Sequence, residues 1–191
     1  MRILEQAKDE ALSSAKIEAL TGWSSHTIRK DISWLEDSDG AAAGSSAGYD
    51  PSALLPVIKK ALGLDKRRKF CIVGLGRLGS AYLNLGTVDF EEFELCAGFD
   101  SNVNRTEILP SPVPLFPAFK MNDVISRFSI EIALLCVPPE AAQTAAEKLA
   151  AAGIKGIVNY APVALKLPPE LPVQNVFVVD ELRALAVKMN K

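Results

Sequence analysis

Residues 70–79 are FCIVGLGRLG, a short apolar run that leads directly into three glycines spaced G-x-G-x-x-G. The run predicts a buried β-strand, and the residues after the last glycine predict a helix toward Leu85. The first glycine of such a loop makes a tight turn, the second lets a pyrophosphate approach the backbone, and the third allows close packing of helix on strand. The candidate cofactor-binding residues here are Gly74, Leu75, Gly76, Arg77, Leu78 and Gly79.

An acidic residue stands at the expected distance from this loop. Asp100 lies 21 positions after Gly79 and follows the next apolar run, residues 93–99. At this place a carboxylate accepts the ribose hydroxyls of NAD and repels a 2′-phosphate. The alternative is a glycine-rich turn with an unrelated aspartate in a loop. Asn102 and Arg105 follow closely enough to reach an adenosine, although solvated loop positions are the simpler interpretation.

The chain beyond the loop alternates between apolar runs and helical patterns. Residues 131–137 and 156–160 predict buried strands, and the alanine-rich stretch 139–152 predicts a helix closed by Gly153. Strands and helices in alternation indicate parallel strands with right-handed crossovers. The sequence therefore predicts an α/β fold with a Rossmann-like parallel sheet.

The first 38 residues predict short helices. Ser13 or Ser14 can cap a helix to Leu20, and Gly22 allows a tight turn before a second helix begins at Ser24 or Ser25. That second helix, ending near residue 35, has an apolar stripe on one face. Two short helices joined by a turn with glycine are typical of a helix-turn-helix. The opposite face of the second helix gathers His26, Arg29, Lys30 and Ser33.

Composition divides the chain further. Residues 37–48 are small and lack an apolar period, which predicts a linker. A helix follows from Pro51 to about residue 63, with a kink or an early stop expected at Pro56. Residues 110–117 predict a loop with one short strand at most, and the apolar residues 176–179 predict a strand before a final helix. The predicted domains are 1–50 (winged helix), 51–175 (dinucleotide binding) and 176–191 (C-terminal strand and helix).

Composition also limits the class of protein. The 49% hydrophobic and 23% charged residues are those of an ordinary globular chain, and the longest apolar stretch is far below the roughly 20 residues of a membrane helix. No signal-peptide pattern opens the chain, so we expect a cytoplasmic protein without membrane contact. The three cysteines predict buried, reduced thiols, and a single histidine without a C-x-x-C motif argues against a metal site.

Enzymatic groups are missing beside the predicted cofactor site. His26 lies far from the glycine loop in the sequence, and no tyrosine is followed four positions later by lysine. A dehydrogenase needs a proton donor or base near the nicotinamide. A bound dinucleotide without such a group predicts a sensor, and the helix-turn-helix predicts what the sensor controls.

With these features the chain resembles the redox-sensing transcriptional repressor Rex family. The similarity covers nearly the whole chain and is strongest at TIRKDIS (27–33), IVGLGRLG (72–79), AGFD (97–100) and GIKGIVNYAP (153–162). The resemblance implies a homodimer with an N-terminal winged helix on operator DNA and a C-terminal NAD(H) domain. It also implies a C-terminal helix exchanged between subunits, and release of the operator by NADH.

The resemblance also implies roles for particular residues. Arg29 and Lys30 would contact DNA, and Arg77 is either a phosphate partner or a solvated side chain. Plain core packing explains the apolar members of the nicotinamide group equally well. The remaining implied DNA contacts are Ser25, His26 and Thr27, and the implied nicotinamide-side residues are Val137, Pro138, Asn159 and Pro162.

Three departures from the family pattern keep alternatives open. The chain begins inside the family's first helix, residues 36–49 contain no Lys or Arg, and Phe177 stands where the family has an aspartate. Residues 1–50 carry 5 basic and 9 acidic side chains, whereas phosphate neutralisation supplies much of DNA affinity. The second hypothesis is therefore an NAD-binding paralogue that contacts protein instead of DNA. A dehydrogenase is the third.

Overall fold

The computed structural model describes residues 1–7, 10–39, 44–45, 48–84 and 92–190. Contacts divide the chain into two compact units, Met1–Lys66 and Arg67–Lys191. The division falls later than the boundary predicted after residue 50, because the helix that follows residue 50 packs on the helices before it.

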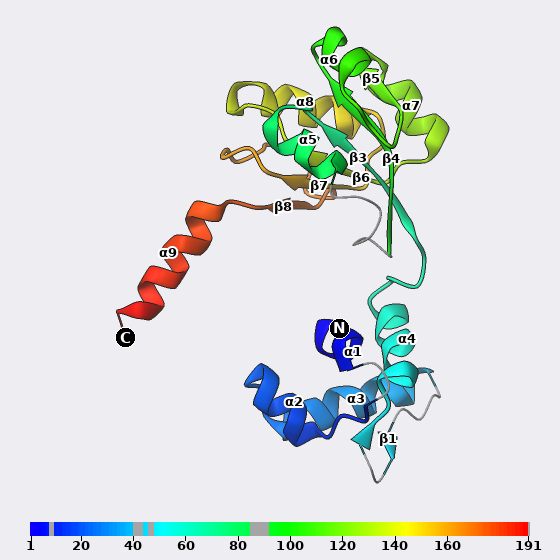
Figure 1. Ribbon diagram of the computed structural model, residues 1–191, viewed down its shortest axis with the longest axis vertical. Helices are drawn as coiled ribbons and strands as arrows, with labels where there is room; N and C mark the ends of the chain where they lie inside the picture. Colours follow the sequence, from blue (N-terminus) through cyan, green and yellow to red (C-terminus); the bar gives the residue numbers. More distant parts are fainter. Residues whose placement is uncertain (8–9, 40–43, 46–47, 85–91, 191) are drawn as a thin grey trace. The chain divides into compact units, whose positions relative to one another are not determined.

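The N-terminal unit consists of short helices and a small antiparallel pair of strands (Figure 1). Its core contains five fully buried apolar side chains contributed by helices and by the segment between α1 and α2. The elements are α1 (Arg2–Ala7), α2 (Ser14–Thr21), α3 (Ser25–Asp39), β1 (Gly44–Ser45), β2 (Gly48–Tyr49) and α4 (Pro51–Ala61).

The predicted helix-turn-helix is present as α2 and α3. The Ser13 side chain caps α2 by accepting a hydrogen bond from the Lys16 N–H at 3.1 Å. Gly22 ends α2 with a left-handed φ of 75°. Ile28 and Ile32 of α3 are buried, as the apolar stripe predicts. The helix continues to Asp39, so the beginning of the predicted linker is helical, while residues 40–43 and 46–47 lie outside the described residues.

Helix α4 runs through Pro56 without interruption, so the predicted early stop is wrong. The Asp50 carboxylate caps the helix by accepting from the Ser52 N–H at 2.9 Å, and Pro51 occupies its first turn. Leu54 and Val57, on either side of the proline, are buried. Burial of these side chains outweighs the backbone hydrogen bond that a proline removes.

The C-terminal unit is built on a six-stranded sheet in the order β5-β4-β3-β6-β7-β8, with every neighbouring pair parallel. This order confirms the predicted α/β fold, because strand order reverses at the β3–β6 pair as in a doubly wound sheet. The strands are β3 (Arg68–Val73), β4 (Phe93–Asp100), β5 (Leu115–Pro117), β6 (Ile132–Leu135), β7 (Gly156–Asn159) and β8 (Val173–Asn175).

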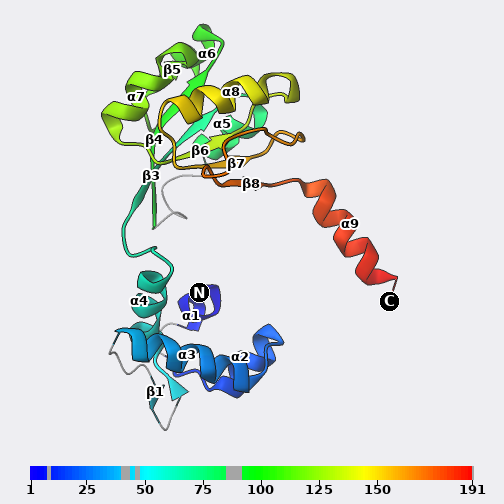
Figure 2. The same cartoon turned by 180° about the vertical axis from the view of Figure 1, so that it is seen from behind.

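Helices cover both faces of this sheet. Leu83 of α5 packs in one cluster with Phe70 and Ile72, whereas α7 and α8 pack on the other face with Cys71 and Val73. Figure 2 shows the second face, with α8 in front of the sheet. The helical segments of this unit are α5 (Arg77–Asn84), α6 (Val103–Ile108), the short 3-10 turn η2 (Ala118–Lys120), α7 (Met121–Phe128), α8 (Pro139–Ala151) and α9 (Val178–Met189).

The C-terminal segment differs from the prediction. The strand expected at residues 176–179 is wrong: β8 ends at Asn175, and Val178 already begins α9. Pairing of Ile157 with Val173 fixes the register of the edge strand, so the later apolar residues fall outside the sheet. No residue of α9 is buried. No helix within the described ranges is both long and apolar enough to cross a bilayer.

The three cysteines are free, but only Cys71 is fully buried. Cys96 and Cys136 are partly buried, so the prediction of complete burial is wrong for these two. Cys136 follows β6 at its carboxyl end, where the sheet meets a cavity.

The closest approach in this unit lies between α5 and the glycine turn, and it predicts a strong effect of one methyl group. A Cβ added at Gly79 would lie 1.9 Å from the Gly74 carbonyl oxygen. Gly79→Ala should therefore lower the free energy of unfolding by at least about 3 kcal/mol, the upper range for overpacked positions. Urea unfolding followed by circular dichroism measures it.

Gly76→Ala is the matched control, because an added Cβ there meets no atom within 4 Å. Its effect on unfolding should stay below about 1 kcal/mol. Equal stability of the Gly79→Ala variant and the unchanged chain would contradict the packing role of the third glycine.

Candidate functional site

A cavity of about 850 Å³ opens at the carboxyl ends of the central strands, where the strand order reverses. Ligands of open α/β sheets bind at this position, and the volume lies in the upper part of the range for small-molecule and cofactor sites. Its lining comes from the glycine loop (Gly74, Gly76, Arg77, Leu78), the end of β4 and α6 (Phe99, Asp100, Ser101, Arg105), the end of β6 (Cys136, Val137, Pro138), and α8 with Tyr160 (Ala141, Thr144, Ala145, Lys148, Tyr160), besides Val73, Ala118 and Met121.

The three glycines of the loop meet different constraints. Gly74 has a left-handed φ of 92°, and a Cβ there would lie 2.6 Å from the Cys136 carbonyl oxygen. Gly79 admits no Cβ against Gly74. Gly76 faces open space in the cavity wall. A methyl-free surface at Gly76 is what a pyrophosphate needs in order to approach the backbone.

Helix α5 begins directly behind this surface. Arg77 is its first residue, and the Ser80 hydroxyl donates to the Gly76 carbonyl oxygen at 2.7 Å. The first four N–H groups of an α-helix have no intrahelical acceptor, and they carry the positive end of the helix dipole. The loop and the first turn of α5 together form a surface suited to anionic oxygens.

Asp100 is buried at the end of β4, with 4% of its surface exposed. Its Oδ2 accepts the Leu75 N–H at 2.7 Å and lies 3.0 Å from Nη1 of Arg105. Its Oδ1 accepts the Asn102 N–H at 2.8 Å. The carboxylate therefore joins the glycine loop to α6. Arg105, expected on the simpler interpretation to be a solvated loop residue, is an ion-pair partner in the cavity wall.

The residues on the opposite side of the crevice separate into two groups. Val137 and Pro138 line the cavity, whereas Asn159 and Pro162 are not among its lining residues. Asn159 is fully buried: its Nδ2 donates to the Val163 carbonyl at 2.9 Å, and its Oδ1 accepts the Ala161 N–H at 3.0 Å. These bonds fix the turn after β7. Leu75 and Gly79 likewise support the loop from behind rather than line the cavity.

A pair of tyrosines that the sequence did not single out connects two parts of the site. The Tyr82 hydroxyl on α5 donates to the Tyr160 hydroxyl after β7 at 2.7 Å, and the ring centroids lie 5.3 Å apart. Burial, reinforced by the Tyr82 hydrogen bond, raises the pKa of Tyr160. Tyr160 therefore stays a neutral O–H at physiological pH. Only the folded chain brings these residues together, since nothing in their local sequence relates them.

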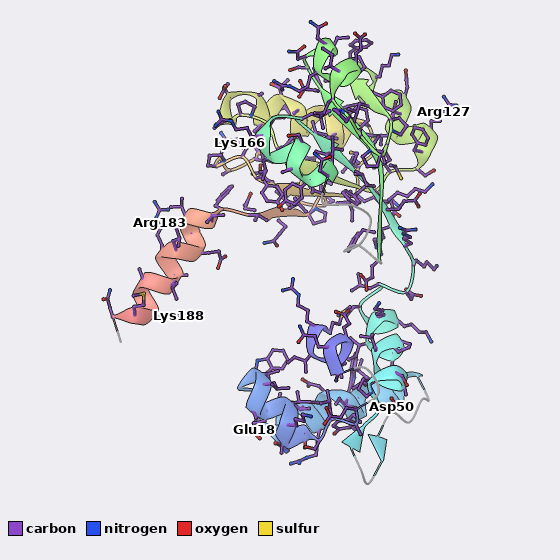
Figure 3. The ribbon with its side chains drawn as sticks, viewed as in Figure 1. Glu18, Asp50, Arg127, Lys166, Arg183 and Lys188 are labelled. Carbon is purple, nitrogen blue, oxygen red and sulfur yellow. The ribbon has the colours of Figure 1, made fainter. Side chains whose placement is uncertain are left out.

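The predicted DNA-contact residues lie together at the beginning of α3. His26, Thr27, Arg29 and Lys30 are exposed, and Ser25 is half-buried. Glu18 of α2 accepts hydrogen bonds from the Ser25 N–H and hydroxyl, which lower the pKa of Glu18. Figure 3 labels Glu18 on α2.

Arg29 makes a second connection between these helices. Its Nη1 donates to the Ser14 hydroxyl of α2 at 3.2 Å. Ser25 and Arg29 thus hold α2 against α3, which leaves His26 and Lys30, one helical turn apart, as outward-facing cationic or polar groups of α3.

Strand order, glycine loop and crevice define a Rossmann-type α/β unit that follows a helix-turn-helix unit. Residues 65–163 match the family model of the CoA binding domain. Redox-sensing transcriptional repressors Rex from Lactobacillus gasseri and Levilactobacillus brevis are 36% and 31% identical, over 92% and 97% of this chain and 80% and 85% of theirs.

A solved structure agrees with these relatives. The Rex-family repressor RSP superposes with a TM-score of 0.83 at 30% identity, over 99% of this chain and 88% of RSP. RSP has also been solved with NAD+ and operator DNA, and with NADH. The chain belongs to the Rex family of redox-sensing transcriptional repressors.

The thiol at the cavity predicts a slow reaction with alkylating agents. Burial raises the pKa of Cys136 to about 12. Since only the thiolate attacks, on the order of one thiol in ten thousand is reactive at pH 8. Iodoacetamide should label Cys136 at least about a hundredfold more slowly in the folded protein than in urea, and faster as pH rises. Peptide mass spectrometry measures the rate, and equal rates in both states would contradict a buried neutral thiol.

Proposed function

We propose that this chain is a homodimeric repressor that binds operator DNA through α3 and senses the NADH/NAD+ ratio through the cavity of its C-terminal unit. The observation that carries the proposal is the joint presence of the helix-turn-helix and the crevice at the sheet's switch point. RSP, which matches 99% of this chain, binds both dinucleotide forms and operator DNA. Such a sensor acts in the cytoplasm, where DNA and the dinucleotide pool meet.

NAD(H) fits the residues that line the cavity. The open surface at Gly76 and the first turn of α5 suit a pyrophosphate, with the Arg77 side chain beside them. Asp100 stands where a ribose is bound, and Val137 and Pro138 form the wall of the second half. Asn159 and Pro162 enter the proposal only as residues that shape the turn behind this wall.

The ionisable side chains of the cavity support sensing rather than catalysis. Asp100 is committed to an ion pair with Arg105. The pKa values of Cys136 and Tyr160 are raised by burial, so both groups stay protonated near neutral pH. Arg77 and Lys148 are the other ionisable lining groups, and both are cationic. A general base matched to neutral pH is absent from this lining, as expected for a protein that reports occupancy.

An unpartnered helix supports the homodimer. Val178, Leu182, Leu185 and Met189 of α9 are between 54% and 77% exposed. Their spacing places them on one face of the helix. An apolar stripe of this length is not stable in water alone, so we propose that α9 is exchanged with a second copy of this chain.

One observation favours the alternative of a paralogue that contacts protein instead of DNA. The last turn of α3 contains Glu36, Asp37 and Asp39, and no Lys or Arg occurs from residue 36 to residue 49. A duplex carries one negative charge for about every 1.7 Å of its axis, so acidic residues beside it are unfavourable.

The exposed cation of α3 tests DNA contact. Lys30→Ala should weaken binding to the RSP operator duplex about fivefold and reduce the slope of log affinity against log salt by about one, because each phosphate contact releases counterions. Fluorescence anisotropy at several salt concentrations measures both. Lys16→Ala is the matched control, since Lys16 pairs with Glu10 at 2.6 Å on α2. Equal effects of both substitutions, or no binding at low salt, would favour the paralogue.

Dinucleotide sensing is tested at Gly76. A methyl group there fills the open surface over which a pyrophosphate passes, so Gly76→Ala should weaken NADH binding at least about tenfold while the fold is kept. Titration of NADH fluorescence gives the affinity. Gly156→Ala is the control, because its added Cβ has only an ordinary contact, with Pro172 at 3.9 Å.

In the same assay NADH should release bound operator from the unchanged chain but not from the Gly76→Ala variant. A ligand can shift this equilibrium only by its difference in affinity for the two states, about 1–3 kcal/mol in ordinary coupling. Unchanged operator binding at saturating NADH would contradict the sensing proposal.

A further inference from the structure

The adenosine end of the crevice contains two groups that normally belong to different cofactor specificities. In Rossmann-type sites an acidic residue at the end of the second strand hydrogen-bonds the 2′-hydroxyl of NAD, whereas a nearby arginine accommodates the 2′-phosphate of NADP. This chain has both at that place, Asp100 and Arg105, and both line the cavity. Their Oδ2 and Nη1 atoms lie 3.0 Å apart.

The carboxylate is largely committed to the protein itself. Two carboxylate oxygens offer about four acceptor positions. The Leu75 N–H, the Asn102 N–H and the Arg105 guanidinium occupy three of them. Asp100 is also only 4% exposed. One acceptor position remains, enough for a single ribose hydroxyl.

The guanidinium, in contrast, remains available to a ligand. The Arg105 side chain is 44% exposed, while that of Asp100 is 5% exposed. A guanidinium has five N–H donors in a planar fork. The Asp100 bond uses one of them, and the remaining donors match phosphate geometry.

Charge around the crevice also favours an additional phosphate. The lining contains three cations, Arg77, Arg105 and Lys148, and Asp100 is its one carboxylate among the described residues. Arg105 neutralises that carboxylate at 3.0 Å, so the repulsion expected between an aspartate and a 2′-phosphate is offset. The Ser101 hydroxyl, next to Asp100, adds a polar group without charge.

We propose that Arg105 determines specificity at the 2′ position of the adenosine ribose, and that the cavity therefore accepts a 2′-phosphorylated dinucleotide, NADPH, as well as NADH. The inference rests on the proposed function, since it concerns the same crevice. Asp100 then holds Arg105 and the glycine loop in place and offers its last acceptor position to an unphosphorylated ribose. The sequence pattern alone, with Asp100 after the second strand, predicts the opposite, a site that rejects the 2′-phosphate.

The test compares NADH and NADPH on the full chain by titration of their fluorescence at low ionic strength. The dissociation constant of NADPH should lie within about tenfold of that of NADH. Arg105→Gln, which keeps the length and polarity of the side chain but not its charge, should weaken NADPH binding at least about tenfold more than NADH binding. Arg105→Lys keeps the charge and should restore most of the NADPH affinity.

Arg127→Gln is the matched control, because Arg127 lies on α7 (Figure 3) and is not among the residues that line the cavity. It should change neither affinity. Should Arg105→Gln fail to fold, the unchanged chain still gives an answer: adenosine 2′,5′-bisphosphate should bind more tightly than adenosine 5′-monophosphate.

NADPH binding more than tenfold weaker than NADH binding in the unchanged chain would overturn the inference and leave the proposed function standing. An equal loss of both dinucleotides in Arg105→Gln would overturn the role of Arg105. Failure of the unchanged chain to bind either dinucleotide would instead overturn the proposed function, and the inference with it.

Discussion

Contact between the glycine turn and α5 determines where every other part of the site can lie. A Cβ at Gly79 would lie 1.9 Å from the Gly74 carbonyl oxygen, and a Cβ at Gly74 would lie 2.6 Å from that of Cys136. Backbone thus packs on backbone between β3, α5 and the end of β6. This approach directs the first turn of α5 at the crevice, and Asp100 completes it by accepting the Leu75 N–H. Phosphate recognition, ribose recognition and strand packing are therefore parts of one constraint.

The same constraint explains why the site suits sensing. Side chains that could exchange protons with a ligand are neutral or paired: Tyr160 is bonded to Tyr82, Cys136 stays a thiol, and Asp100 faces Arg105. The free charges of the lining are positive, and they face phosphate rather than a reacting carbon. A crevice of this composition distinguishes ligands by shape and charge.

Local pattern was sufficient where one stretch of sequence determines its own structure. The glycine loop, the Ser13 cap, the Gly22 turn and the long helix α8 follow from nearest neighbours. It failed at residues 176–179, because the register of an edge strand is set by β7. It also missed the Asp100–Arg105 and Tyr82–Tyr160 pairs as well as the buried hydrogen bonds of Asn159, since these depend on side chains meeting in the folded unit.

Coupling between the two units limits how such a protein can act. All residues of the cavity wall lie in Arg67–Lys191, whereas the proposed DNA contacts lie in Met1–Lys66. A dinucleotide can therefore alter DNA affinity only by favouring one arrangement of the units over another, and only by its difference in affinity for the two. The exposed apolar face of α9 is the element of the chain whose burial against a second copy can differ between those arrangements. A tenfold difference in dinucleotide affinity then corresponds to about 1.4 kcal/mol, which a few apolar side chains of α9 can supply.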